Sequence, residues 1–343
     1  MKFVCYSDWN QLPDSANALF EQAEKGSLFF SRPWFESVTV TTLDDDQTLA
    51  LACVTTGNRV LAILPLMKNA GKTLHSIKHR YTSLYSLLLA DDDQQRILAC
   101  LAQGLSQLPI NGLLLEPVAN DDNILSGLQR HLESAGFSCS HTFRFYNWIY
   151  RVHGQSHEDY MTMRPAKLRN TIFRKARKLE REHGYEIRLF TGDDVPQAMA
   201  DYYAIYNASW KAHEQNVDFV DDIVSSFSSK GWSRLAILYI KGQPAAAQLW
   251  FVCHDKANIF RLAYDEAWKP YSLGSILTSF LTEYVIDTDK VEEIDFLTGN
   301  EAYKQDWMSH RRERFVLCCS RSVKPKAWHQ RAGESLKRLL ARP

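Results

Sequence analysis

Apolar and polar residues follow two different periods along the first half of the chain, which predicts a mixture of strands and helices. Apolar runs at 49–54 and 60–67 flank the sequence TTGNR, a spacing typical of a β-hairpin. A third strand is predicted at 82–89, and two further strands at 137–142 and 146–152 close this half. Apolar residues spaced three and four apart predict helices over 91–105 and 123–135. These elements would form a sheet covered by amphipathic helices.

The second half of the chain repeats this plan. The segments 235–240, 245–253 and 259–264 read as three successive strands, and the short turns KGQP and HDKA fit an antiparallel meander. A helix is predicted over 195–211 ahead of these strands, and a loop, a helix over 275–288 and a strand over 292–296 follow them. The two halves share little sequence identity. We therefore predict a duplicated architecture of class α/β (α+β), with two mixed-sheet halves.

A strongly basic segment, Met161–His183, joins the halves. Its apolar stripe has helical spacing, and lysine and arginine cover much of the remaining surface. One interpretation is phosphate binding, either to the nucleotide of a donor, to a sugar-nucleotide acceptor or to RNA, with Arg169 and Arg174 as candidate substrate-binding residues. The alternative is a solvated helix whose cations pair with acids elsewhere.

Composition narrows the class of protein. A length of 343 residues favours two domains or a duplicated one, and the formal net charge of zero argues against a general nucleic-acid binder. The seven scattered cysteines without a C-x-x-C pair predict reduced thiols in a cytoplasmic protein. The histidines form no metal-ligand spacing, and we see neither a signal peptide nor an apolar run long enough to span a bilayer.

A glycine loop in the second half is the best candidate for a cofactor site. Tyr271, Ser272, Leu273, Gly274 and Ser275 follow a strand and open a helix, where backbone N–H groups and the helix dipole attract a diphosphate. Such a turn is purely structural in most proteins. The comparison with the first half strengthens the interpretation, because the corresponding helix there begins with Asp91-Asp92-Asp93. Three carboxylates would repel an anion, so we expect only the second half to bind one.

Four residues after the glycine-loop helix could carry chemistry. Asp295 and Glu301 are candidate proton acceptors, although each could instead form an ion pair or cap the following short helix. Lys304 could stabilise an oxyanion, and Tyr303 could protonate a leaving thiolate or simply pack. No Ser/His/Asp or Cys/His arrangement indicates a covalent nucleophile.

The segments RPAKLRNTIFRKARKLE, AYDEAWKPYSLGSIL and EEIDFLTGNEAYKQDW resemble the GNAT superfamily, and more narrowly a BioF2-like or CelD-like acetyltransferase domain related to the Fem peptidyltransferases. The resemblance is strongest over 160–320. It implies a tandem GNAT-like fold, acyl transfer by direct attack on a thioester, and an acyl-coenzyme A diphosphate at Tyr271–Ser275. This loop keeps only Gly274 of the usual Q/R-x-x-G-x-G/A signature.

The resemblance also assigns residues. An aromatic–lysine pair in the Fem-like relatives corresponds to Tyr303-Lys304. His213, in the run that borders the acceptor site of GNAT folds, is a candidate for acceptor recognition, and Arg261 and Tyr264 are candidates to line the acyl groove.

The resulting hypothesis is a cytoplasmic N-acyltransferase that moves an acyl group, expected to be acetyl, from acyl-coenzyme A to an amine in cell-envelope or polysaccharide metabolism. We predict an N-terminal degenerate half at 1–158, a linking helix at 159–184, a catalytic half at 185–323 and a basic tail at 324–343. Two alternatives stay open: a Fem-like transferase that uses aminoacyl-tRNA, and a non-catalytic module that binds a phosphorylated partner.

Overall fold

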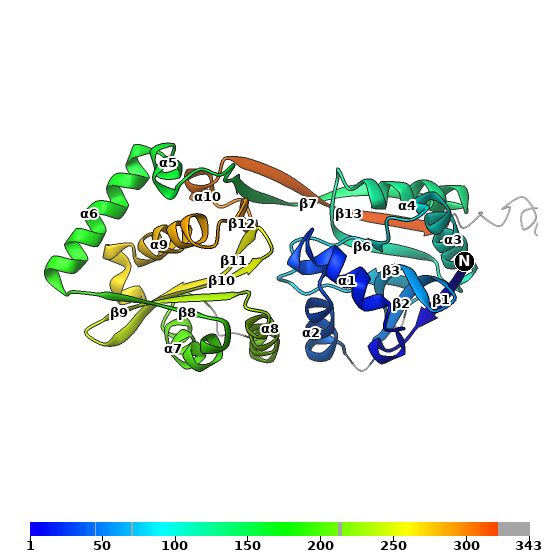
Figure 1. Ribbon diagram of the computed structural model, residues 1–343, viewed down its shortest axis with the longest axis horizontal. Helices are drawn as coiled ribbons and strands as arrows, with labels where there is room; N and C mark the ends of the chain where they lie inside the picture. Colours follow the sequence, from blue (N-terminus) through cyan, green and yellow to red (C-terminus); the bar gives the residue numbers. More distant parts are fainter. Residues whose placement is uncertain (45, 70, 212–214, 322–343) are drawn as a thin grey trace, which may run out of the picture.

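A computed structural model describes residues 1–44, 46–69, 71–211 and 215–321. The predicted basic tail at 324–343 lies outside this range. The described chain forms two halves side by side, linked by two long strands that run from one half into the other (Figure 1).

The N-terminal half consists of a sheet with helices against it. Its regular elements, in chain order, are β1 (Lys2–Tyr6), α1 (Ala16–Glu24), α2 (Arg32–Thr42), β2 (Thr48–Thr56), β3 (Arg59–Lys68), β4 (Thr73–Ser76), β5 (Leu88–Leu89), α3 (Gln94–Gln107), β6 (Gly112–Ala119), α4 (Asn123–Ser134) and β7 (Phe137–Arg151). The helix starts follow from local chemistry. Ser31 caps α2 by accepting from the Trp34 N–H, and Asp122 caps α4.

The C-terminal half follows two linking helices. Its elements are α5 (His157–Thr162), α6 (Ala166–Glu182), β8 (Glu186–Thr191), α7 (Val195–Asn207), α8 (Val217–Ser229), β9 (Ser233–Ile240), β10 (Gln243–Cys253), β11 (Lys256–Tyr264), the 3-10 helix η4 (Glu266–Tyr271), α9 (Leu273–Asp287), β12 (Glu293–Thr298), α10 (Lys304–Trp307) and β13 (His310–Arg321). Helices α6 and α9 lie on one face of this half's sheet and α7 and α8 on the other (Figure 1).

All of these strands belong to one sheet, in the order β1-β2-β3-β4-β6-β13-β7-β12-β11-β10-β9-β8, with β5 paired to β3. Each half contains an antiparallel meander that ends in one parallel pair, β4 with β6 and β11 with β12. The duplicated α/β architecture expected from the sequence is therefore confirmed.

The last strand does not stay with the half that precedes it. β13 lies between β6 and β7 and pairs antiparallel with both. β7 in turn pairs with β13 along its length and with β12 at its end, through Asn147–Arg151. The two halves thus share their central strands, and the domain limits proposed from the sequence stay a prediction.

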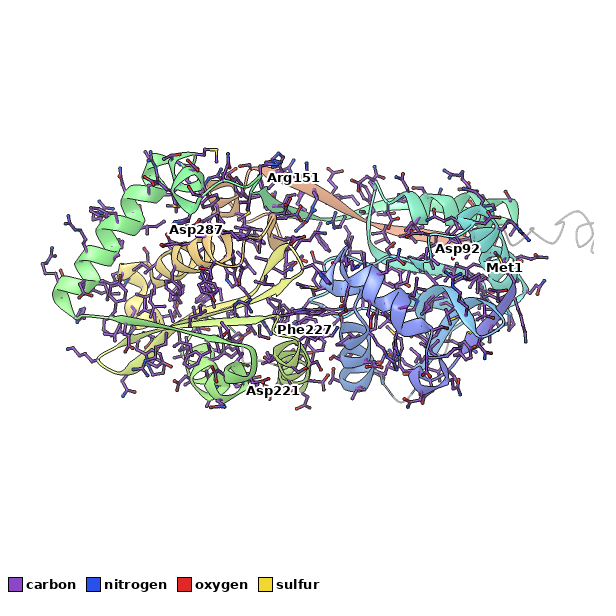
Figure 2. All side chains as sticks on the ribbon, in the orientation of Figure 1. Met1, Asp92, Arg151, Asp221, Phe227 and Asp287 are labelled. Carbon is purple, nitrogen blue, oxygen red and sulfur yellow. A yellow bond between two sulfur atoms is a disulfide. The ribbon has the colours of Figure 1, made fainter. Side chains whose placement is uncertain are left out.

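The halves also meet through α2 and α8. The Ser37 hydroxyl donates to the Asp222 carboxylate, and the Trp34 ring packs against Phe219 with ring centroids 5.4 Å apart. Phe227 of α8 is fully buried at this junction (Figure 2). The two halves are therefore in apolar contact through these helices as well as through the shared sheet.

Three secondary-structure predictions need correction. The segment predicted as a strand at 82–89 contributes only the two residues of β5, and the third meander strand is β4 instead. The two strands predicted at 137–142 and 146–152 are one continuous strand, β7. The helix predicted over 195–211 ends at Asn207, and α8 was not predicted at all.

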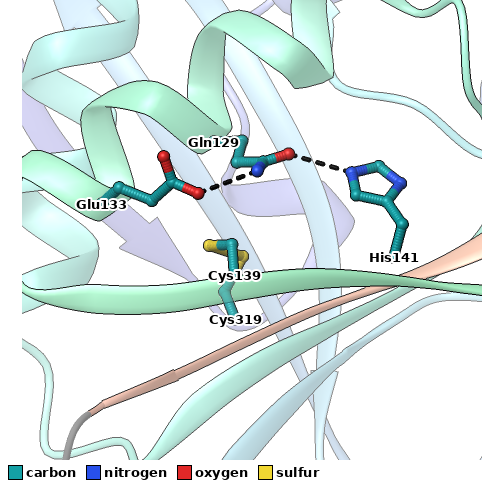
Figure 3. Close-up of a disulfide and its surroundings, with 5 residues drawn as sticks. All are labelled: Gln129, Glu133, Cys139, His141 and Cys319. Carbon is teal, nitrogen blue, oxygen red and sulfur yellow. Dashed lines mark hydrogen bonds between the residues drawn. A yellow bond between two sulfur atoms is a disulfide. The ribbon is translucent and has the colours of Figure 1, made fainter.

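The prediction of reduced thiols is wrong for one pair of cysteines. Cys139 of β7 and Cys319 of β13 stand directly opposite in the antiparallel register and form a disulfide (Figure 3). The bond lies beneath α4, whose Gln129 contacts His141 of β7 at 2.9 Å. The pairing depends on the position of β13 in the sheet, so the spacing of the cysteines along the chain gave no sign of it.

Candidate active site

A cavity opens where the parallel strands β11 and β12 part. Their pairing covers only Lys256–Asn258 and Glu293–Asp295. Beyond that point, side chains from both strands line a cavity of about 820 Å³, Ile259 to Leu262 and Tyr264 on one side and Phe296 to Thr298 on the other. The strands therefore provide the two walls of the site.

The start of α9 borders this cavity. Ser272, Gly274 and Ser275 of the predicted cofactor loop line it, and Ser272 has the left-handed backbone conformation, with φ 55°. The other two predicted residues are turned away: Leu273 is buried in the core, and the Tyr271 hydroxyl donates to Glu182 at the end of α6. The first N–H groups of a helix lack partners within the helix, so this end can bind an anion.

A buried glutamine holds the start of α9 in place. The Gln248 amide of β10 donates to the Gly274 carbonyl oxygen and to the Thr278 hydroxyl, each at 2.8 Å, and its own oxygen accepts from the Trp250 indole. Gln248 is 0% exposed and was not predicted from the sequence. A polar residue inside the apolar run of a central strand could have been its signal.

Lys304, Tyr303 and Glu301 also line the cavity. The Lys304 ammonium is 4% exposed and donates to the carbonyl oxygens of Phe296 at 3.0 Å and Thr298 at 2.6 Å. It also lies 3.2 Å from the Glu301 carboxylate. An ammonium group has three hydrogens, so all three are engaged. Lys304 therefore fixes the end of β12 as well as placing a positive charge beside the cavity.

The pKa values of Lys304 and Tyr303 are shifted by their surroundings. Burial lowers the pKa of Lys304, and Glu301 opposes the shift. Burial raises the pKa of Tyr303 to about 12, and the Glu301 charge acts in the same direction. Tyr303 thus keeps its proton at neutral pH and can act as a donor.

Asp295 lies outside this group. Its carboxylate accepts from Asn147 at 2.5 Å, from the Leu297 N–H at 2.6 Å and from Arg312 at 2.8 Å. These contacts match the ion-pair interpretation rather than a base facing a substrate. They support Leu297, whose φ of 52° is unfavourable for a side chain of its size.

Arg261 and Tyr264 of β11, predicted to line an acyl groove, both line this cavity. The Arg261 guanidinium donates to the hydroxyls of Tyr81 and Tyr206. Tyr81 belongs to the N-terminal half, and its neighbour Arg80 also lines the cavity. Both halves therefore build the site.

The remaining predicted substrate-binding residues have different positions relative to the cavity. Arg174 and Arg169 are exposed on α6, and Arg174 lines a smaller hollow beside the cavity. His213 lies outside the described residues. Among the described residues, no group of three or more histidine, cysteine or acidic side chains is arranged to hold a metal ion. In the same part of the chain, every helix is too short or too polar to traverse a bilayer.

Lys211 is a cavity residue that sequence reasoning missed. Its ammonium donates to the Leu262 carbonyl oxygen of β11, and burial together with the nearby Arg261 lowers the pKa of Lys211 to about 8. It ends the aromatic run YAIYNASWK, where a lysine next to Trp210 was a usable signal.

The corresponding place in the N-terminal half is filled. Beyond the β4–β6 pair, the Tyr85 N–H donates to the Pro117 carbonyl oxygen and its hydroxyl donates to that of Pro65. The Tyr85 ring is 0% exposed. Helix α3 starts at Gln94, and the preceding Asp93 caps it by accepting from the Arg96 N–H. At this place the first half therefore has a buried tyrosine and an acidic helix start, where the second half has a cavity and a helix start free of acids.

Part of the chain matches the model of a known protein domain. Residues 166–305 match the model of the acetyltransferase (GNAT) domain, which confirms the resemblance inferred from the sequence. The structure of FemX superposes with a TM-score of 0.63 at 10% identity, over 91% of this chain and 96% of that one. No curated protein matches the sequence.

Two further structures have the same fold. L-PGS from Bacillus licheniformis gives a TM-score of 0.56 at 12% identity, over 91% of this chain and 93% of that one. The C-terminal domain of a putative lysylphosphatidylglycerol synthetase from Agrobacterium fabrum gives 0.55 at 13% identity, over 83% and 90%. At these identities the likeness establishes the fold alone. The chain has a tandem GNAT-like fold of the acyltransferase type, with Fem-like neighbours.

Proposed function

We propose that this protein is an N-acyltransferase that uses acyl-coenzyme A as donor and an amine as acceptor. The observation that carries the proposal is the inequality of the two halves. In the C-terminal half a cavity between parting strands meets a helix start free of acids, at Ser272–Ser275. In the N-terminal half Tyr85 fills the same place and Asp91–Asp93 precede the helix.

The donor would lie with its diphosphate at the start of α9 and its thioester between β11 and β12. Backbone N–H groups and the positive end of the helix dipole favour the two phosphate charges. Beyond Asn258, β11 still pairs with β10 but no longer with β12, so the N–H and C=O groups on its open edge can bond to the amides of the pantetheine arm. An acetyl group is the expected cargo.

In the transfer step the amine nitrogen attacks the thioester carbonyl carbon. A C–N bond forms, the C–S bond breaks, and the thiolate leaves. Tyr303 can supply its proton to that thiolate, and the proton released by the amine can return to Tyr303 through Glu301 or solvent. The positive charge of Lys304 favours the negative charge that develops on the carbonyl oxygen.

Calorimetry with acetyl-coenzyme A tests the donor site. Wild type should bind, and Gly274→Asp should not, because it places a carboxylate at the helix start. A Cβ at Gly274 would lie 3.4 Å from Leu262, so Gly274→Asn is the matched control for size. Binding by Asn and loss by Asp supports the site. Equal binding by Asp, or no binding by wild type, overturns it.

The identity of the acceptor and the cellular location of the protein are also proposals. Family context favours an amine in a cell-envelope or polysaccharide precursor, and the cytoplasm as the site of action. Because Arg80 and Tyr81 of the first half line the cavity, we propose that this half shapes the acceptor side.

A Fem-like transferase that uses aminoacyl-tRNA is the second candidate. The FemX likeness and the exposed arginines of α6 favour it. It predicts that transfer depends steeply on salt and that coenzyme A binds poorly. A non-catalytic binding module would instead show no loss of any transfer activity on Lys304→Ala.

A further inference from the structure

A second hollow, of about 460 Å³, lies on the basic helix α6 beside the cavity. Lys167, Asn170, Thr171, Phe173 and Arg174 line it. Lys167 and Thr171 also line the larger cavity, so the two spaces adjoin. Residues three and four apart share one side of a helix, so Lys167, Thr171 and Arg174 form a row leading out of the cavity.

The cations of this row differ from three other basic residues of α6, which already have partners within the protein. The Lys175 ammonium bonds to the Pro270 carbonyl oxygen, Lys178 lies 3.7 Å from Glu182, and Arg181 bonds to Glu182 at 2.9 Å. Lys175 thus joins α6 to the η4 loop, whereas Lys178 and Arg181 are paired with Glu182 of the same helix. Over the described residues, neither Lys167 nor Arg174 forms an ion pair, so both remain available to an anion from outside.

The lining has the side-chain chemistry that recognises a nucleotide. Phe173 is 61% exposed, and the Arg177 guanidinium lies 4.6 Å from its ring centroid, which leaves the opposite face of the ring open. Aromatic rings stack on nucleobases, and arginine and lysine bind phosphate through charge-assisted hydrogen bonds. The Asn170 amide and the Thr171 hydroxyl can bond to ring nitrogens or ribose hydroxyls.

We propose that this hollow binds the 3′-phosphoadenosine end of coenzyme A. The adenine lies against Phe173, and the 3′-phosphate is bound by Arg174 and Lys167. The inference rests on the proposed function, because it continues the donor outward from the start of α9. It also separates the two arginines singled out from the sequence: Arg174 contacts the donor and Arg169 does not.

The test measures binding by calorimetry with three probes: coenzyme A, 3′-dephospho-coenzyme A and adenosine 3′,5′-bisphosphate. Arg174→Ala should weaken coenzyme A binding on the order of tenfold, the usual effect of losing one bond to a charged group. It should leave 3′-dephospho-coenzyme A unchanged. Phe173→Ala should weaken all three probes, and the bisphosphate should compete with coenzyme A.

Arg169→Ala is the matched control, because it removes an exposed arginine of the same helix outside the hollow. All these residues are exposed, so the variants should keep the wild-type melting temperature.

If wild type binds coenzyme A and the Arg174 and Phe173 variants bind it equally well, the inference fails and the donor assignment stands. If wild type binds no coenzyme A, the proposed function is wrong, and the inference that rests on it is wrong as well. Tight binding of an aminoacyl-tRNA with no binding of coenzyme A also overturns the inference.

Discussion

The Lys304 ammonium bonds to the Thr298 carbonyl oxygen at 2.6 Å, across the turn where β12 leaves the sheet. Its second bond, to Phe296, fixes the same turn. Lys304→Ala removes the donor from two carbonyls at a site 4% exposed. We expect it to lower the free energy of unfolding by about 1–3 kcal/mol, measured by urea denaturation.

The control for that change is Lys269→Ala, which removes an exposed lysine at the same cavity. It should alter stability by less than about 0.5 kcal/mol. If the two variants are equally stable, Lys304 does not hold the end of β12.

Asp295 and Arg312 should be energetically coupled. Their 2.8 Å ion pair joins β12 to β13, with 11% and 30% of the side chains exposed. In a double-mutant cycle with Asp295→Asn and Arg312→Gln, we expect a coupling energy of about 1–3 kcal/mol in unfolding experiments. Additive effects would show that the pair contributes nothing, which would reopen a role for Asp295 in proton transfer.

Tyr85 should be required for the stability of the N-terminal half but not for donor binding. Tyr85→Ala opens a cavity in a fully buried place, so we expect a loss of about 3–5 kcal/mol. Tyr85→Phe removes only the hydroxyl that bonds to Pro65 and should cost about 1 kcal/mol. The stoichiometry of acetyl-coenzyme A should stay at one per chain in both. A second bound donor in Tyr85→Ala would contradict the assigned role of Asp91–Asp93.

Local patterns were enough for much of the fold. The hairpin of β2 and β3, the meander of β9 to β11 and the helix α9 have strong periodicity and short turns, and each was predicted within a few residues. Helix α8 was missed although Phe219, Ile223 and Phe227 have helical spacing. That signal was present in the sequence and not used.

Other features depend on contacts between distant segments. The position of β13 between β6 and β7 is set by strands far earlier in the chain, and the disulfide of Cys139 and Cys319 follows from that register. The same holds for the site. A local motif singled out Gly274, and a family resemblance singled out Lys304. Tyr81, in contrast, reaches Arg261 only because the two halves pack together.

Lys211 should make stability depend on pH. Its pKa is about 8 in the folded protein and near 10.5 when unfolded. Below pH 8 both states hold the proton, and the folded state bears the full cost of a buried charge. Between pH 8 and 10.5 the unfolded state binds more protons, so stability from this group rises with pH. At 1.36 kcal/mol per pKa unit the cost is roughly 3 kcal/mol at most.

Lys211→Met should therefore gain about 1–3 kcal/mol relative to wild type at pH 7, less the lost bond to Leu262, and the gain should shrink towards pH 10. Urea denaturation at several pH values measures the difference between the two profiles. Lys175→Met is the matched control, because Lys175 also donates to a backbone carbonyl but at the surface of α6. Parallel profiles for wild type and Lys211→Met would show that this lysine is an ordinary surface cation.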